Sequence, residues 1–252
     1  MADAGAPSRP PHSLARPVVV ISQPMLFPWA GMFEQIRLAD VYVHYPDVQF
    51  SKGSFTNRVQ VKTAGGSRWL TLPLRDLQLG QRIDEVLLDD RRDWRRSHLD
   101  LLAQAFDGAP FRDDALDIVR STYATDSERL LDILLAGLDA CVRYLGFDAG
   151  RRFVDSRELD IGGHGSARVL EVVRRFEGAT YVTGHGARNY LDHEAFEQAG
   201  VAVEYMDYRK TAHAQLHGPF TPHVSVLDPI ANLGRAAAGV ITSGTTHWRQ
   251  FA

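Results

Sequence analysis

Residues 17–45 read PVVVISQPMLFPWAGMFEQIRLADVYVHY, and their pattern decides the fold class. The β-branched run at 17–22 predicts a buried strand. Apolar residues recur at helical spacing over 29–38, which predicts a helix. Residues 40–45 alternate and are β-branched, which predicts a second strand. A strand, a helix and a strand within about 30 residues form a βαβ unit, and this crossover implies a parallel sheet.

The alternation of helices and strands returns after residue 150, whereas the middle of the chain is mostly helical. Helices are expected at 94–105, 113–122 and 126–145, the last with Asp126 as N-cap and Gly146 as its stop. A hairpin is expected from 59–62 and 69–74, and 83–88 is expected to add an edge strand. Later strands are expected at 153–156, 180–183 and 201–206, and helices at 168–176 and 195–199. The predicted fold is α/β, with a mixed, mainly parallel sheet flanked by helices and a mostly helical middle segment.

The 252 residues suit one large domain or two small ones, and neither a clear linker nor an internal repeat divides them. We expect a disordered leader at residues 1–16 and one α/β domain at residues 17–252, with a helical insert at about 91–150. The leader has no apolar core, so it is not a secretory signal, and the apolar run at 17–22 is too short to cross a membrane. The cytoplasm is the expected compartment, and the sequence predicts no oligomeric state.

Composition and motifs exclude several classes of function. The net charge is -3 and the pI is about 6.4, so a broad nucleic-acid-binding surface is not expected. The single cysteine, Cys141, lies among leucines at helical spacing and is expected to be a core thiol. A nucleophile elbow, a P-loop and a complete dinucleotide fingerprint are absent from the sequence. The histidines follow no metal-ligand pattern, so we expect no metal site, and the cofactor is unknown.

Polar residues follow the first two predicted strands. Gln23 comes after the first strand, and Asp47, Lys52, Asn57 and Arg58 come after the second. The carboxyl ends of parallel strands meet at one edge, where open α/β sheets bind ligands. Lys52 and Arg58 are candidate anion partners, and Asp47 is a candidate base. The alternatives are a turn cap for Gln23 and a solvated loop for the others.

A second candidate loop follows the strand predicted at 180–183. Gly184 and Gly186 can bring the backbone close to a ligand, and His185 between them is a candidate acid–base group. Asn189 and Tyr190 follow directly. The alternative interpretation of His185 is a turn histidine.

Two helix starts complete the candidate residues. The glycine-rich segment 161–166 leads into a helix, with Ser166 as a candidate N-cap. Asp228 and Asn232 are four residues apart, and Asp228 precedes Pro229. This order is typical of an N-cap followed by the first helical residue. Asp228 can hold that role and line a pocket as well.

Taken together, these residues resemble the WbqC-like protein family over about 17–240. The residues that carry the resemblance are Gln23-Pro24, Phe27-Pro28, Gly31, Phe33, Gln35-Ile36, Asp40, Asp47-Val48-Gln49, Lys52, Asn57-Arg58, Trp69-Leu70-Thr71, Pro73, Gly184, Gly186-Ala187, Asn189-Tyr190-Leu191, Gln215, Phe220, Pro222, Ser225, Asp228, Asn232 and Gly234. One departure is Pro46, which stands where family members often carry a second acid. Members of the family are encoded in bacterial O-antigen and other polysaccharide gene clusters, so the resemblance implies modification of a nucleotide-linked sugar or a similar precursor.

The leading hypothesis is a transferase that joins an acyl or aminoacyl group to an amino group of a nucleotide-activated sugar or related metabolite. The predicted catalytic residues are Asp47, Lys52 and His185. The predicted substrate-binding residues are Gln23, Asn57, Arg58, Gly184, Gly186, Asn189, Tyr190, Asp228 and Asn232. One alternative is a nucleotidyl or phosphoester transferase, and another is a non-catalytic binding protein of glycan biosynthesis.

Overall fold

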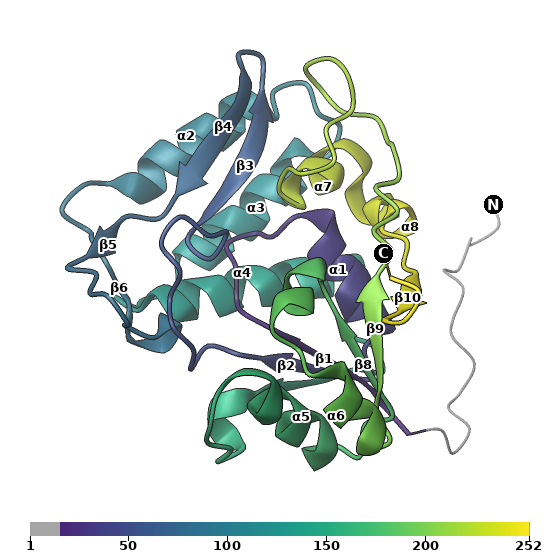
Figure 1. Cartoon of the computed structure of the whole chain (residues 1–252). Coiled ribbons are helices and arrows are strands. Elements are labelled where there is room, and N and C mark those ends of the chain that lie inside the picture. The colour runs from purple at the N-terminus through teal and green to yellow at the C-terminus, as the bar shows by residue number, and fades with distance from the viewer. Residues whose placement is uncertain (1–15, 252) are drawn as a thin grey trace.

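A six-stranded sheet organises the computed structural model, which describes residues 16–251. The expected leader therefore lies, apart from Arg16, outside the described residues. The strands stand in the order β10-β9-β8-β1-β2-β7 (Figure 1). Their bounds are β1 Val18–Ser22, β2 Val41–His44, β7 Arg152–Asp155, β8 Thr180–Thr183, β9 Ala202–Met206 and β10 Thr245–His247. All neighbours are parallel except β9 and β10, which confirms the mixed, mainly parallel sheet.

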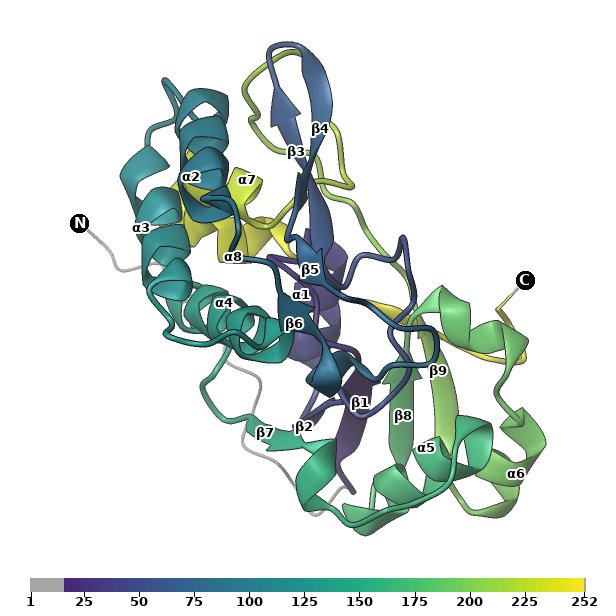
Figure 2. The ribbon, with the colours of Figure 1, turned by 90° about the vertical axis from the view of Figure 1, so that its left-hand side faces the viewer.

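Each face of the sheet is covered by its own set of helices. Successive strand residues point to opposite faces, so Val20 and Tyr42 join one apolar cluster while Val19 and Val41 join the other. The first cluster packs against α1 (Ala30–Leu38) and α4 (Leu130–Leu145). The second packs against α5 (Gly165–Arg175) and α6 (His193–Gln198). Figure 2 shows these two helical layers on either side of the strands.

The strand order reverses between β1 and β8. The chain runs outward from β1 through α1 to β2, and β7 later adds to the far side of β2. Helix α5 then carries the chain back, so that β8 pairs with the free side of β1, and β9 follows. The loops after β1 and β8 therefore leave on different faces of the sheet. A ligand crevice is expected at such a switch point.

The helical middle segment is confirmed, with one helix shorter than predicted. It contains α2 (Trp94–Ala105), α3 (Arg112–Tyr123) and α4. Helix α4 starts at Leu130, so Asp126 is not its N-cap. The preceding segment is extended instead, because Leu88 N–H donates to the Glu128 carbonyl (2.8 Å) and Leu130 N–H donates to the Val86 carbonyl (3.0 Å). Gly146 ends α4 in the left-handed conformation, with a φ of 70°.

The predicted hairpin forms, but the predicted edge strand does not join the main sheet. Strands β3 (Arg58–Thr63) and β4 (Gly66–Thr71) pair antiparallel and project at the top of Figures 1 and 2. In the 83–88 segment, residues 83–85 form a 3₁₀ turn, which the Glu85 carboxylate stabilises by accepting from the Arg82 N–H (3.0 Å). Only β6 (Leu87–Leu88) forms a strand, and it pairs with β5 (Leu74–Arg75).

Helix starts in the last third of the chain differ from the predicted ones. Helix α5 begins at Gly165, and the Ser166 hydroxyl instead accepts from the Asp192 N–H (2.8 Å). Helix α7 (Leu227–Leu233) already contains Asp228, so Asp228 is not its N-cap. The short helix α8 (Ala237–Val240) follows. Among the helices in the described part of the chain, none has the length and apolar character needed to cross a membrane.

Candidate functional site

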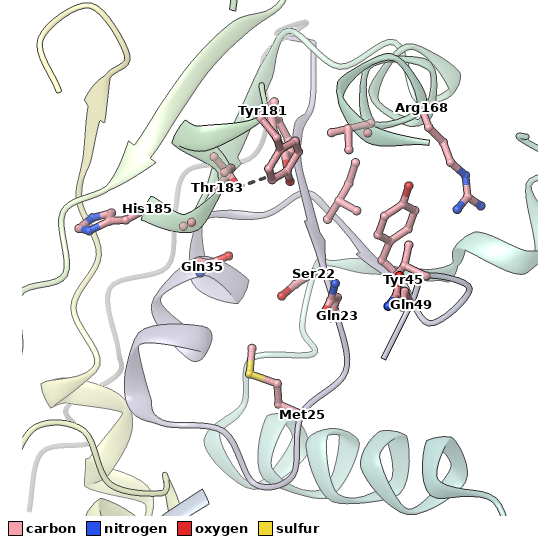
Figure 3. A pocket seen from close by; sticks show the side chains of 18 of the residues that line it. Ser22, Gln23, Met25, Gln35, Tyr45, Gln49, Arg168, Tyr181, Thr183 and His185 are labelled. Carbon is pink, nitrogen blue, oxygen red and sulfur yellow. Dashed lines mark hydrogen bonds between the residues drawn. The ribbon is translucent and has the colours of Figure 1, made fainter. Parts of the chain in front are cut away.

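A cavity of about 730 Å³ lies over the carboxyl ends of β1, β2 and β8, at the switch point of the sheet. Its floor carries Ser22, the last residue of β1, and Gln23, which follows it. Figure 3 shows these two side chains between Gln35 on one side and Tyr45 and Arg168 on the other. The cavity, called the main pocket below, is lined by Ile21, Ser22, Gln23, Met25, Trp29, Met32, Gln35, Tyr45, Asp47, Val48, Gln49, Arg82, Gly163, His164, Gly165, Arg168, Val169, Tyr181, Thr183, Gly184, His185, Gly186, Ala187, Tyr190 and Tyr208.

One end of the main pocket is built around Tyr208. Gln35 donates an amide hydrogen bond to the Tyr208 hydroxyl (2.8 Å), and the Trp29 and Tyr208 rings lie 4.8 Å apart. A Cβ added at Gly184 would come within 2.9 Å of the Tyr208 oxygen. Gly184 is therefore required by the close approach of Tyr208, since its own φ of -81° suits any residue.

Trp29 forms a wall of the main pocket, and its indole packs closely against Gly31. A Cβ added at Gly31 would lie 2.3 Å from the indole of Trp29. On its other side, Trp29 lines a second cavity of about 20 Å³, next to Glu34. Burial raises the pKa of the Glu34 carboxyl to about 7. Trp29 thus separates the main pocket from a small enclosed space with an acidic side chain.

The other end of the main pocket is built around Arg168, the side chain of which is 7% exposed. Its guanidinium forms an ion pair with Asp47, donates to the Ile161 carbonyl (2.9 Å) and lies 4.8 Å from the centre of the Tyr45 ring. Burial alone would raise the pKa of Asp47, but hydrogen bonds from Arg168 and Ser156 outweigh it and lower that pKa. Asp47 is therefore ionised at neutral pH and fixes the position of Arg168.

Four tyrosines supply neutral hydroxyl groups to the main pocket. Burial raises the pKa of Tyr45, Tyr181 and Tyr190, and it raises the pKa of Tyr208 to about 12. All four therefore stay protonated at neutral pH. They can donate or accept hydrogen bonds but cannot act as bases.

The His185 ring is directed away from the centre of the main pocket (Figure 3). Its Nε2 lies 2.6 Å from the Met206 carbonyl oxygen, which can only accept, so Nε2 carries the hydrogen. The ring packs 5.0 Å from Tyr208 and 4.8 Å from Phe251. The second nitrogen, Nδ1, is left as the acceptor.

The structure brings half of the sequence-predicted site residues together. Those that line the main pocket are Gln23, Asp47, Gly184, His185, Gly186 and Tyr190. Lys52 and Asn189 are exposed and lie outside it. Asn57 is buried elsewhere and donates to the Leu72 carbonyl (2.9 Å), while Arg58 lies over the exposed Trp69 ring at 4.3 Å. These two residues hold the β3–β4 hairpin.

Asp228 and Asn232 form a separate buried cluster on α7. The Asp228 carboxylate lies 3.5 Å from His213 Nε2, and Asn232 donates to the Asp228 carbonyl (2.8 Å). Neither side chain lines the main pocket. Their contacts stabilise the segment that leads from β9 into α7.

Sequence reasoning missed the side chains that define the two ends of the main pocket, Arg168 and Tyr208. A signal for Arg168 was present, because it occupies the apolar face of α5 four residues before Val172. Tyr208 lies in an irregular segment with no periodic pattern, so no local signal could have found it.

Comparison with known proteins assigns the chain to a family. The model of the WbqC-like protein family matches residues 23–239. "Uncharacterized protein Rv1507c" of Mycobacterium tuberculosis is 30% identical over 222 residues, which cover 87% of this chain and 95% of that protein. No solved structure matches the chain. The family match includes every residue that lines the main pocket except Ile21 and Ser22. The chain belongs to the WbqC-like protein family.

Proposed function

We propose that this protein is a biosynthetic transferase that binds a nucleotide-linked sugar in the main pocket and joins an acyl or aminoacyl group to an amino group of that sugar. The observation that carries the proposal is the cavity of about 730 Å³ at the switch point between β1 and β8, with aromatic rings at one end and Arg168 at the other. Doubly wound sheets bind nucleotides at this place. The link between the WbqC-like family and polysaccharide gene clusters agrees with such a substrate.

The two ends of the main pocket match the two ends of a nucleoside diphosphate. Trp29 and Tyr208 offer ring faces on which a base can stack. Arg168 offers a cation, and its Nη1 lies 3.5 Å from the Asp47 carbonyl oxygen, a long contact that leaves it able to donate to a phosphate. Gly163 and Gly165 allow the start of α5 to lie along the same end.

The proposed reaction forms one bond and breaks one. The amine nitrogen bonds to the acyl carbon, the leaving group of the donor takes the electron pair of the broken bond, and the amine loses one proton to a base. Asp47 is held by Arg168 and Ser156, and Lys52 lies outside the main pocket. Of the two imidazoles that line the main pocket, the His185 ring is directed away from its centre, so His164 is the proposed proton acceptor. The tyrosine hydroxyls can stabilise the charge that develops on the acyl oxygen.

Calorimetry with the purified chain tests the binding step. Uridine diphosphate, thymidine diphosphate and their sugar conjugates are the ligands. Arg168→Met is expected to weaken nucleotide binding about 10-fold, since a charge-assisted hydrogen bond is lost. Arg174→Met is the matched control, because Arg174 is an exposed residue of the same helix. A folded protein that binds none of these molecules would refute the proposal.

Mass spectrometry then tests the transfer. The protein is incubated with amino-sugar nucleotides and a panel of acyl-coenzyme A and aminoacyl donors, and the expected product is the sugar nucleotide heavier by one acyl group. Tight binding without any product would instead favour a non-catalytic binding protein.

A further inference from the structure

A further hollow, of about 420 Å³, adjoins the main pocket. We call it the annex; it is lined by Asp47, Arg82, Ser156, Arg157, Asp160, Ile161, Gly162, Gly163 and Arg168. Four of these residues, Asp47, Arg82, Gly163 and Arg168, line the main pocket as well. Because the same side chains border both spaces, one ligand can extend from the main pocket into the annex past Arg168.

Two arginines of the annex are each paired with a carboxylate but retain unused donors. Arg82 binds Asp84 through Nε (2.9 Å) and Nη2 (2.7 Å). Arg157 binds Asp155 in the same way, through Nε (3.0 Å) and Nη2 (2.7 Å). In both, Nη1 has no protein acceptor within residues 16–251. Each paired carboxylate fixes the plane of a guanidinium, and the free nitrogen can donate to a bound molecule.

Asp160 provides acceptors in the same hollow. Its carboxylate is exposed and has no hydrogen-bond or ion-pair partner among the described residues. The annex thus combines fixed donors from arginines with free acceptors from a carboxylate. Its three arginines are outnumbered by four carboxylates, those of Asp47, Asp84, Asp155 and Asp160, so a further phosphate would gain little net attraction there. Hydroxyl groups both donate and accept, and an ammonium group donates to a carboxylate, so a hydroxylated ring with an amino group fits this lining.

We infer that the annex is the sugar compartment of the substrate site, in which Arg82 and Arg157 donate to ring hydroxyls and Asp160 accepts from the amino group. The inference rests on the proposed function, in which the nucleoside diphosphate occupies the main pocket. Arg168 borders both spaces and meets the diphosphate that connects the base to the sugar. Asp160 therefore selects an amino sugar over its hydroxyl counterpart.

Calorimetry on the full chain tests the annex with three probes: uridine diphosphate, UDP-glucose and UDP-glucosamine. The native protein is expected to bind UDP-glucosamine about 10-fold more tightly than UDP-glucose, as one charge-assisted hydrogen bond predicts. Asp160→Asn is expected to abolish this preference, and Arg157→Gln is expected to weaken both sugar conjugates. Neither substitution should change the affinity for uridine diphosphate. Glu158→Gln is the matched control, because Glu158 is exposed, lies two residues from Asp160 and does not line the annex.

The possible failures can be told apart. If uridine diphosphate binds but the preference for the amino sugar is absent, or survives Asp160→Asn, the annex assignment is overturned and the proposed function stands. If Glu158→Gln abolishes the preference as well, the effect is general surface charge, and the annex assignment is again overturned. A folded protein that binds neither these probes nor thymidine diphosphate overturns the proposed function and the annex assignment together.

Discussion

Replacing Asp47 with alanine removes the carboxylate that holds Arg168 in the main pocket. The side chains of Arg168 and Asp47 are only 7% and 12% exposed. After the substitution, the guanidinium keeps the Ile161 carbonyl and the Tyr45 ring but has no counter-charge. Breaking a buried ion pair from one side costs about 3–5 kcal/mol. Because the guanidinium keeps its other contacts, we expect Asp47→Ala to lower the free energy of unfolding by about 2–3 kcal/mol, a fall in Tm of roughly 5–10 °C.

The stability lost in Asp47→Ala should become smaller as the pH falls. Hydrogen bonds from Arg168 and Ser156 hold the pKa of Asp47 below its usual value in the folded protein, whereas an unfolded Asp has a pKa of about 3.9. A carboxylate of this kind contributes stability above its unfolded pKa, and that contribution is lost as the pH falls through the folded value. The difference in the free energy of unfolding between the native protein and Asp47→Ala is therefore expected to be largest at neutral pH and to shrink below about pH 4.

Urea unfolding of four proteins measures the pair itself: the native chain, Asp47→Ala, Arg168→Met and the double variant. The double variant is expected to be more stable than the sum of the single losses predicts, with a coupling free energy of about 2 kcal/mol. Asp117→Ala is the control, because the Asp117–Arg120 pair is exposed and should contribute less than about 1 kcal/mol. If Asp47→Ala is as stable as the native chain and the coupling is near zero, the pair is incidental and Asp47 is again a candidate proton acceptor.

Three further outcomes are expected. Gly184→Ala should cost about 1–3 kcal/mol in urea unfolding, because its Cβ would come within 2.9 Å of the Tyr208 oxygen. Gly186→Ala should be nearly neutral, because no atom of the described residues lies within 4 Å of its Cβ. Equal stability of the two variants would contradict this packing. Burial raises the pKa of Glu34 to about 7, so the folded protein binds the carboxyl proton more tightly than the unfolded chain does. The stability that this proton contributes is lost as the pH rises through 7. Glu34→Gln should therefore flatten the fall in Tm between pH 5 and pH 8, and an unchanged slope would count against the buried acid. Lys52→Ala should leave calorimetric nucleotide affinity within about twofold, because Lys52 is exposed outside the main pocket; a larger loss would place the segment between β2 and β3 in the site.

The sheet was predictable because its strands are encoded locally. The apolar residues 18–21 are all β-branched, and Pro17 and Gln23 mark the two ends of the segment. The strand predicted at 17–22 therefore differs from β1 by one residue. Strand β8 was placed without error for the same reason. Parallel pairing followed from the connecting helix, and parallel pairing alone put Gln23 and Asp47 at one edge.

The features that could not be predicted depend on contacts between segments that are distant in the sequence. Asp126 precedes α4 and is a good helix cap by residue type, but the segment after it pairs with β6, some 40 residues away. Arg58 follows the second strand closely in sequence, yet it stacks on Trp69 across the hairpin. Tyr208 is held at the main pocket by Gln35, which lies 173 residues earlier and donates to its hydroxyl, and by the Trp29 ring. Local patterns carry no information about such pairings.

The position of Trp29 makes its intrinsic fluorescence a probe of ligand binding in the main pocket. The indole rests on Gly31, lies 4.8 Å from Tyr208 and 5.2 Å from His223, and borders both the main pocket and the small cavity beside Glu34. A molecule that enters the main pocket alters the polarity around this ring, and tryptophan emission shifts with such a change. Comparison with Trp29→Phe subtracts the other tryptophans, so unlabelled compounds can be screened against the native chain by fluorescence alone.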